Sequence, residues 1–372
     1  MERTKIVKLG DVLNFKRGHD LPKIKMQDGK IPVAGSNGII GYHNEETPIH
    51  PCITIGRSGN VGTPYIYDKC WAHNTVLYVD DFKSNDPKYL YYLLKTIPLS
   101  SFGGGSAVPT LNRNHIHPIE IKYFENIKTQ KKIASFLSSL DDKIELNRRI
   151  NENLEQQAQA LFNYYFIEHS EILGDYEKGN LTEIATYTNG LPMQKFRPQD
   201  EEKGMPVLKI KELGQGQTDN SSDICSENIA NEYKVTNGDV IFSWSGTLMV
   251  KVWCGGLCGL NQHLFKVTSE KYPKWYYYFW TKFHLNKFIR IAQDKAVTMG
   301  HIRRGDLESS EVLVPKMDIL AKLNEIINPI FNQIIGIECE NRNLAQLRDT
   351  LLPRLMSGEL AITDVDDRSI FQ

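Results

Sequence analysis

Apolar side chains recur at intervals of three and four residues in two long stretches of the chain, one central and one near the C-terminus. This spacing places them on one face of a helix, and its persistence over many turns is typical of a coiled-coil seam. The first predicted helix covers roughly residues 129–169, and the second begins near residue 320. Each would be roughly 60 Å long for about 40 helical residues. The seam positions are Ile133, Leu137, Leu140, Ile144, Leu154, Ala158 and Leu161 in the first helix, and Leu320, Leu323, Ile327, Ile330, Ile334, Ile337, Leu344 and Leu351 in the second.

The two helical stretches are versions of one unit. Residues 151–162 and 341–352 match at an offset of 190, the difference between Leu344 and Leu154. Asn341 coincides with Asn151 under this offset, and a buried Asn in a seam fixes register at some cost in stability. We therefore predict that the helices pair with each other in antiparallel alignment. The alternative, that each helix packs only on its own globular segment, stays open. Pro329 is expected to kink the second helix or to mark its start.

A mixed segment precedes each helix, and the two segments share landmarks. Lys8-Leu9-Gly10-Asp11-Val12 resembles Asn180-Leu181-Thr182-Glu183-Ile184, and each leads to a glycine, Gly18 or Gly190. Short β-rich runs follow, then helical patterns, then a last strand. We predict a mixed α/β (α+β) fold of two similar globular domains, joined and separated by two long antiparallel coiled-coil helices as an internal pseudo-two-fold repeat. The predicted boundaries are 1–127, 128–170, 171–316, 317–360 and a tail at 361–372.

Composition excludes several protein classes. The 372 residues include only six cysteines without regular spacing, and the N-terminus lacks an apolar leader, so a secreted disulfide framework is not predicted. No apolar run is long enough to cross a bilayer; the aromatic run at residues 275–280 is too short. We expect a cytoplasmic protein. The formal net charge of -1 gives no global basic signature, so any nucleic-acid surface must arise from local segregation of charge.

Acidic residues are segregated in this way. They number 45 of 372, about one in eight, yet residues 47–67, 87–119 and 242–269 contain none, and residues 275–304 contain only Asp294. A surface that contacts phosphates must exclude carboxylates. Strands and helices near a core are also poor in charge, and for residues 242–269 this explanation stays open. The predicted partner is double-stranded DNA.

Two loop types stand out in these stretches. Gly56-Arg57-Ser58-Gly59-Asn60 is matched by Ser243-Trp244-Ser245-Gly246-Thr247, each directly after a strand, and residues 102–114 are matched by residues 296–301. Arg and Asn side chains suit guanine and adenine edges in the major groove, and hydroxyl and ammonium groups suit phosphates. The predicted DNA-binding residues are Arg57, Ser58, Asn60, Thr110, Asn112, Arg113, Asn114, Ser245, Thr247, Lys287, Arg290, Lys295, Thr298, Arg303 and Arg304.

Catalytic alternatives have weaker support. Glu120-Ile121-Lys122 has the Glu-x-Lys pattern of metal-dependent nucleases, with Asp80 or Asp81 as a possible partner, but the corresponding strand at residues 311–315 lacks the lysine. A methyltransferase motif, a cofactor-binding glycine loop and a Walker loop are not found. Cys254, Cys258 and His263 are too loosely spaced to favour zinc over buried thiols. We predict no catalytic residue, no metal site and no bound cofactor.

Together the motifs resemble the specificity subunit of type I restriction-modification enzymes. The motifs that carry the resemblance are Lys8-Leu9-Gly10-Asp11 at the start, Gln130-Lys131-Lys132 entering the first helix, Leu154-Glu155-Gln156-Gln157-Ala158 near its end, and Leu352-Pro353-Arg354-Leu355 closing the second. The second helix departs from the pattern, with Leu320-Ala321-Lys322 in place of Gln-Lys-Lys.

The resemblance implies a function without catalysis. Each globular domain would read one half of a bipartite, asymmetric DNA site, and the paired helices would set the gap. Two modification subunits would bring S-adenosylmethionine and methylate adenine, while restriction subunits would use ATP and Mg²⁺ to translocate and cleave. A stand-alone DNA-binding regulator and a self-sufficient nuclease remain as alternatives.

Overall fold

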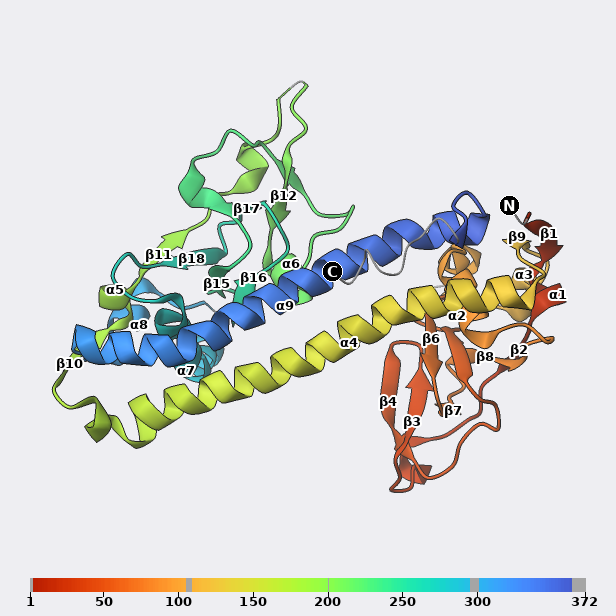
Figure 1. The fold of residues 1–372 in the computed structure, drawn as a ribbon, viewed down its shortest axis with the longest axis horizontal. Helices are drawn as coiled ribbons and strands as arrows, with labels where there is room; N and C mark the ends of the chain where they lie inside the picture. The colour runs from red at the N-terminus through yellow and green to blue at the C-terminus, as the bar shows by residue number, and fades with distance from the viewer. Residues whose placement is uncertain (1–2, 105–108, 200, 295–300, 363–372) are drawn as a thin grey trace. The chain divides into compact units, whose positions relative to one another are not determined.

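The computed structural model describes residues 3–104, 109–199, 201–294 and 301–362 (Figure 1). The chain divides into two compact units. Unit 1 comprises Met1–Asp142 and Ala345–Gln372, and unit 2 comprises Lys143–Leu344. Both long helices pass from one unit into the other, so each unit combines a globular part with a portion of each helix.

Among its described residues, unit 1 contains three small sheets and three short α-helices. Strands β1 and β9 form an antiparallel pair, β2-β8-β5-β6 form an antiparallel four-stranded sheet, and β4-β3-β7 form a three-stranded sheet in which β3 and β7 are parallel. The strands are β1 Lys5–Lys8, β2 Asn14–Arg17, β3 Ile31–Gly35, β4 Gly38–His43, β5 Cys52–Gly56, β6 Pro64–Tyr67, β7 Trp71–Ala72, β8 Val76–Asp81 and β9 Glu120–Tyr123. The helices are α1 Leu9–Val12, α2 Pro87–Lys95 and α3 Arg113–Ile116.

Unit 2 repeats this plan sheet by sheet. Strands β10 and β19 pair as β1 and β9 do, the order β11-β18-β15-β16 matches β2-β8-β5-β6, and the sheet β13-β12-β17-β14 contains a parallel pair, as the sheet of β3 does. The strands are β10 Tyr176–Asn180, β11 Thr186–Asn189, β12 Met205–Leu208, β13 Ile224–Cys225, β14 Lys234–Val235, β15 Asp239–Ser243, β16 Met249–Trp253, β17 Cys258–Leu260, β18 Leu264–Thr268 and β19 Glu311–Pro315. The helices are α5 Leu181–Ile184, α6 Ile210–Gln215, α7 Lys274–Asp294 and α8 Arg304–Glu308.

The landmarks that match in sequence have the same structural role in both units. The backbone N–H of Lys8 donates to Asp11 at 3.1 Å, and that of Asn180 donates to Glu183 at 3.1 Å, so a carboxylate caps the first helix of each unit. Gly18 and Gly190 are required for a different reason. A Cβ at Gly18 would lie 2.1 Å from the carbonyl oxygen of His73, and a Cβ at Gly190 would lie 2.2 Å from that of Asn261. The close approach of two backbones therefore fixes both glycines.

The core of unit 2 is dominated by aromatic side chains from α7. All six residues from Trp275 to Trp280 are buried. Tyr278 contacts Phe331 on the C-terminal helix with ring centroids 5.1 Å apart, and Trp280 contacts Phe162 on the central helix at the same distance. Aromatic residues cover every side of this part of α7 because it packs against the sheet and both long helices. The run is therefore core and does not stack on bases.

The two long helices pair with each other, as predicted. They are α4, Ile127–Asn163, and α9, Met317–Ser357. Inside unit 2 the side-chain amide of Asn147 donates to Glu340 at 2.8 Å, and that of Asn151 donates to the carbonyl oxygen of Ile334 at 3.1 Å. From the first contact to the second, the residue number on α4 rises while the residue number on α9 falls, so the two helices are antiparallel. Inside unit 1, Arg348 pairs with Asp141 in the same sense. These pairs and the repeated sheets confirm the predicted fold class.

Three details differ from the sequence analysis or add to it. Asn341 does not lie at the level of Asn151, because an antiparallel pair brings equivalent positions to different levels. Helix α9 begins at Met317, so Pro329 lies inside the helix and does not start it. A disulfide that the sequence analysis did not predict joins Cys52 and Cys70. Within the described residues, no helix combines the length and apolar character that a bilayer crossing requires.

Candidate DNA interface

The interface candidate in unit 1 is a tight turn after β5. A Cβ at Gly56 would lie 1.8 Å from the carbonyl oxygen of Asn60, and Gly59 and Gly62 have positive φ angles of 85° and 82°. These glycines are what the turn geometry requires. The backbone N–H groups of Arg57 and Ser58 both donate to the carbonyl oxygen of Thr75, at 2.8 and 3.2 Å. The turn is therefore tied to the loop before β8.

A second segment, residues 109–116, joins this turn. Ser58 and Thr110 form an isolated antiparallel bridge, and the N–H of Leu111 donates to the carbonyl oxygen of Arg57 at 2.7 Å. Leu111 is buried and anchors the segment, after which Asn112 caps α3 by accepting from the N–H of Asn114 at 2.9 Å. The structure thus joins the two loop types that the sequence analysis had singled out separately.

Unit 2 makes the same junction with other residues. Ser245 and His301 form the isolated antiparallel bridge, and the N–H of Ile302 donates to the carbonyl oxygen of Trp244 at 3.1 Å. Ile302 is buried as Leu111 is, and Arg303 then precedes α8 as Asn112 precedes α3. Backbone contacts alone therefore match Arg57 with Trp244, Thr110 with His301 and Asn112 with Arg303.

The predicted residues of unit 1 take different positions around this junction. Asn60, Thr110, Asn112 and Asn114 are exposed, whereas Arg57 and Ser58 are half-buried. One guanidinium nitrogen of Arg57 donates to the carbonyl oxygen of Asn74 at 3.4 Å, and no acidic partner for Arg57 exists among the described residues. Arg113 differs, because it donates to the carbonyl oxygen of Phe15 at 3.2 Å and so ties α3 to β2.

The predicted residues of unit 2 are equally varied. Thr247, Arg290, Arg303 and Arg304 are exposed, while Ser245 is buried, so its backbone rather than its hydroxyl lies at the junction. The ammonium group of Lys287 donates to the carbonyl oxygen of Ser309 at 3.1 Å. Arg304 lies 3.6 Å from the carboxylate of Glu308, a loose pair with an arginine side chain that is 82% exposed. Lys295 and Thr298 lie outside the described residues.

Trp244 is a candidate site residue that was not among the residues predicted from the sequence. It lies in the turn after β15, its ring stacks on Phe265 with centroids 5.6 Å apart, and its indole N–H donates to the side chain of Asn189 at 3.0 Å. A cavity of about 440 Å³ lies beside it, lined by Thr182, Ala185, Thr186, Tyr187, Asn189, Trp244, Phe265, Ile302, Arg304 and Leu307. The available signal was an aromatic residue in a glycine-containing turn within an acid-free stretch. Pairing rules for base edges do not select Trp244, because an indole ring has a single hydrogen-bond donor.

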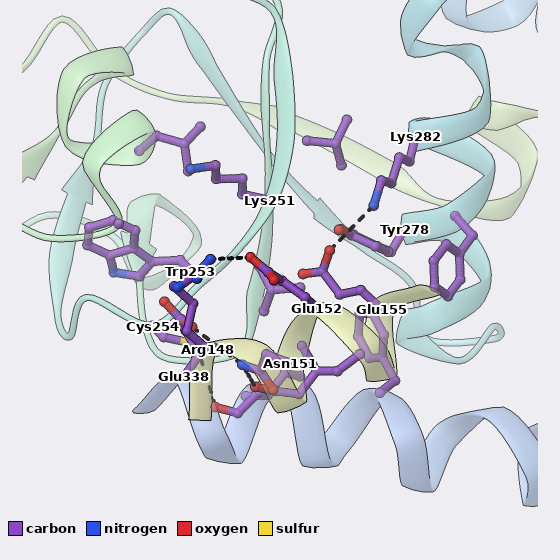
Figure 2. A pocket seen from close by; sticks show the side chains of 18 residues that line it. Arg148, Asn151, Glu152, Glu155, Lys251, Trp253, Cys254, Tyr278, Lys282 and Glu338 are labelled. Carbon is purple, nitrogen blue, oxygen red and sulfur yellow. Dashed lines mark hydrogen bonds and ion pairs between the residues drawn. The ribbon is translucent and has the colours of Figure 1, made fainter. Parts of the chain in front are cut away.

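A further cavity of about 410 Å³ in unit 2 has as many carboxylates as cations in its lining (Figure 2). Helix α4 contributes Glu152 and Glu155 to its lining, and α9 contributes Glu338. Lys282 lies 3.8 Å from Glu155, so a carboxylate already balances this cation. The three carboxylates offset the charges of Arg148, Lys251 and Lys282, so this lining offers the phosphate backbone no net positive charge. The junction with its exposed arginines therefore remains the better interface candidate in unit 2.

The nuclease and zinc alternatives gain no support from the geometry. Glu120 lies on β9 opposite Lys8, whereas Asp80 lies on β8 of another sheet and accepts a hydrogen bond from Asn14 at 2.6 Å. No group of three His, Cys, Asp or Glu side chains suited to a metal ion occurs within the described ranges. Cys254 and Cys258 are free and buried, and burial raises the pKa of the Cys258 thiol to about 12, which disfavours the thiolate that zinc requires.

Known proteins with similar sequences or folds point to one family. The family model for the type I restriction modification DNA specificity domain matches residues 1–156 and 174–348. The specificity subunit of the type I restriction enzyme MjaIX of Methanocaldococcus jannaschii is 28% identical over 306 residues, which cover 75% of this chain and 70% of that protein. The HindI specificity subunit of Haemophilus influenzae is 21% identical over 309 residues, which cover 63% of this chain and 67% of that protein.

The fold comparison agrees with the sequence comparisons. The crystal structure of the S subunit of the type I restriction-modification system of M. genitalium superposes with a TM-score of 0.61 at 15% identity, covering 95% of this chain and 96% of that one. At this identity the match supports the fold alone. The family model, in contrast, matches each half of the repeat separately and covers most of the sequence. The chain therefore belongs to the family of type I restriction modification DNA specificity domains and carries the domain twice.

Proposed function

We propose that this chain is the non-catalytic DNA-specificity subunit of a type I restriction-modification enzyme. Unit 1 and unit 2 each read one half of a bipartite, asymmetric DNA site. The observation that carries the proposal is the double match of the specificity domain, with the same backbone junction present once in each match. Residues 1–127 and 171–316 are the recognition domains, residues 128–170 and 317–360 the spacer helices, and residues 361–372 a tail.

Recognition at each junction uses side chains that the backbone leaves accessible. In unit 1 these are Arg57, Asn60, Thr110, Asn112 and Asn114, with Ser58 and Arg113 holding the turn and α3 in place. In unit 2 they are Thr247, Arg290, Arg303 and Arg304, supported by Ser245 and Lys287, and the proposal extends to Lys295 and Thr298. Arginine side chains suit phosphates and guanine edges, and the side chain of Arg304 stays 82% exposed although it lies 3.6 Å from Glu308. Different residues at matching positions would give the two half-sites different sequences.

The partners supply the chemistry. Two modification subunits bind the chain, bring S-adenosylmethionine and methylate adenine, and restriction subunits use ATP and Mg²⁺ to translocate and cleave DNA. The support is family membership, together with the lack of a metal-binding cluster within the described part of the chain. The complex acts in the cytoplasm, where its DNA substrate is found.

Mapping of methylated adenine tests the proposal directly. The chain is expressed with its modification subunits in a host free of other adenine methyltransferases, and genomic DNA is sequenced by a method that detects N6-methyladenine. We expect methylation at a single motif with two unlike halves and a fixed gap, and none without the chain. A continuous motif, or methylation that persists without the chain, would overturn the proposal. Tight specific binding by the chain alone would favour the stand-alone regulator instead.

A matched insertion tests the role of the helices. Seven residues are added after Asp142 in α4 and seven after Leu344 in α9, which preserves the seven-residue repeat of the seam. Each helix grows by roughly 10 Å at about 1.5 Å per residue, equivalent to about three base pairs at roughly 3.4 Å each. The gap in the methylated motif should lengthen by that amount while both half-sites stay the same. The same seven residues added after Gln372 serve as the control, and an unchanged gap would refute the spacer role.

A further inference from the structure

Trp244 occupies the position in unit 2 that Arg57 occupies in unit 1. The carbonyl oxygen of each accepts a hydrogen bond from the buried residue of the neighbouring segment, Leu111 at 2.7 Å in unit 1 and Ile302 at 3.1 Å in unit 2. The following serine forms the isolated bridge in both units. If this position faces DNA in unit 1, the shared backbone geometry makes it face DNA in unit 2.

Trp244 has no free hydrogen-bonding group to offer a base. Its only donor, the indole N–H, is engaged by Asn189 at 3.0 Å. The ring stacks on Phe265 at 5.6 Å and is half-buried, so its accessible part is hydrocarbon and π surface. A base edge rich in hydrogen-bonding groups would lose its water at this surface and gain no partner.

The cavity beside Trp244 has an apolar part in its lining. Ala185, Ile302 and Leu307 are buried in its wall, and Phe265 adds an aromatic face. The hydroxyl of Tyr187 is turned to Thr281 at 2.7 Å, so this ring also presents carbon to the cavity. None of the residues that line it carries a carboxylate, and the exposed Arg304 belongs to the lining, where a phosphate can approach.

We propose that Trp244 and this cavity read the 5-methyl group of a thymine in the half-site bound by unit 2. The methyl group is the one apolar feature that distinguishes bases in the major groove, and apolar side chains are what recognise it. This inference rests on the proposed function, because it assigns a base feature to one of the two recognition units.

Uracil substitution tests the inference at the level of one methyl group. The assembled complex with its modification subunits is titrated with the duplex defined by methylation mapping, with each thymine of both half-sites replaced singly by uracil. At one position of one half-site the affinity should fall about fourfold, the factor that burying one methylene-sized group is worth. In the other half-site, the change in affinity on replacing thymine by uracil should be the same with and without the Trp244 side chain.

Variants connect the effect to this residue. Trp244→Ala should weaken binding of the thymine duplex and bring the thymine-to-uracil ratio at that position to about one, whereas Trp244→Phe should retain a ratio above one because an apolar ring remains. Leu257→Ala is the control, since Leu257 is a similarly apolar, 49% exposed side chain of unit 2 that does not line the cavity. Urea unfolding of each variant separates loss of contact from loss of fold.

The outcomes distinguish this inference from the proposed function. A bipartite motif with a half-site that lacks A·T pairs, or a thymine-to-uracil ratio unchanged by Trp244→Ala, overturns the thymine contact and leaves the specificity role intact. The absence of any bipartite motif overturns the proposed function itself. Loss of affinity that is equal for thymine and uracil at every position indicates that Trp244 only supports the turn, which also overturns the inference.

Discussion

The junctions of unit 1 and unit 2 share a backbone and differ in side chains. In both units, the turn after one strand of the four-stranded sheet, β5 or β15, forms a bridge to the segment that precedes a short helix. The bridge joins Ser58 to Thr110 in unit 1 and Ser245 to His301 in unit 2. The residue next to the bridge is Arg57 in unit 1 and Trp244 in unit 2. The comparison teaches that a recognition surface can change its chemistry without a new fold, because backbone hydrogen bonds hold the turn.

The cores beneath the two junctions differ more than the junctions do. Helix α2 has nine residues and α7 has 21, although a similar sequence stands at the start of both: Pro87-Lys88-Tyr89 opens α2, and Pro273 directly precedes Lys274-Trp275 of α7. Tyr89 accepts a hydrogen bond from the N–H of Phe124 at 3.1 Å, whereas Trp275 donates to Asn324 on α9 at 2.9 Å. Unit 2 therefore relies on aromatic packing between α7 and the long helices to a degree that unit 1 does not.

Removing one aromatic ring from the core of unit 2 should have the largest effect. Trp275→Ala deletes a fully buried side chain, and such substitutions cost about 3–5 kcal/mol. We expect the urea unfolding midpoint of unit 2 to fall sharply while unit 1 keeps its own. Phe283→Ala is the matched control on the same helix, because Phe283 is 44% exposed and should change the midpoint little. Equal effects of the two substitutions would show that α7 is not the core helix described above.

The two glycines that permit close backbone approach should be equally intolerant of substitution. Gly18→Ala and Gly190→Ala place a Cβ within 2.1–2.2 Å of a carbonyl oxygen, and overpacking of this kind costs about 1–3 kcal/mol. Urea unfolding should show similar losses in the corresponding units. Gly336→Ala in α9 meets no atom within 4 Å and should instead stabilise the helix by about 0.8–1 kcal/mol. A large loss in only one unit would mean that the repeat is not equivalent at this point.

Exchanging Arg57 and Trp244 between the two junctions should change the base preference of each half-site. Arg57→Trp removes a bidentate donor and Trp244→Arg introduces one, and such an arginine contact discriminates between bases by about 1–3 kcal/mol. Methylation mapping or selection from randomised half-sites should show a changed preference at one position in each half-site. Circular dichroism and urea unfolding verify that each variant is folded. Unchanged preferences in folded variants would argue that neither residue reaches a base.

The smallest predicted effect is a dependence of stability on pH that both units share. Burial lowers the pKa of His117, helped by Arg113 and Lys83, and burial also lowers the pKa of His284. A histidine whose pKa is lower in the folded chain binds a proton more readily when unfolded. Its contribution to stability is therefore complete above the ordinary value of 6.5 and is lost as the pH falls below it.

The two histidines differ in how they are hydrogen-bonded. Nε2 of His117 accepts from the N–H of Phe15 at 3.2 Å, so protonation breaks that bond, whereas Nε2 of His284 donates to the carbonyl oxygen of Glu311 at 2.8 Å and keeps its bond. We expect the urea midpoint to decline as the pH falls below about 6.5, the reference histidine pKa. His117→Gln and His284→Gln should each flatten the decline. If the urea midpoint of the variant with both substitutions declines as steeply as that of the unaltered chain, the pH dependence comes from other groups.

The seam of the long helices was predictable because helical periodicity is a local property. Spacings of three and four place Leu137 and Leu140 on one face whatever the rest of the chain does, and both are fully buried. The internal repeat, the capped openings of the two units and the glycines at 18 and 190 were visible for the same reason. The two loop types that meet in each junction were also visible, because acid-free composition and strand–turn patterns are carried by contiguous residues, whereas their contact with DNA stays a prediction.

Contacts between distant residues were decided only by the tertiary structure. Ser58 meets Thr110 across 52 positions, and Cys52 meets Cys70 across a separation of 18. Periodicity contains no information on such partners. The roles within the predicted site also depended on them: Arg113 donates to Phe15 and so supports α3, while Trp244 gives its only donor to Asn189.

The amino-acid sequence by itself determined where the two long helices lie, which two segments are alike, and where acid is excluded, because each of these is recorded in neighbouring residues. Tertiary structure decided the register at which Asn151 meets Ile334, the joining of two loops into one junction, and which side chains stay accessible beside it. The physical reason is that register and exposure follow from the packing of surfaces far apart in the chain. A change at either surface alters them without altering the local pattern.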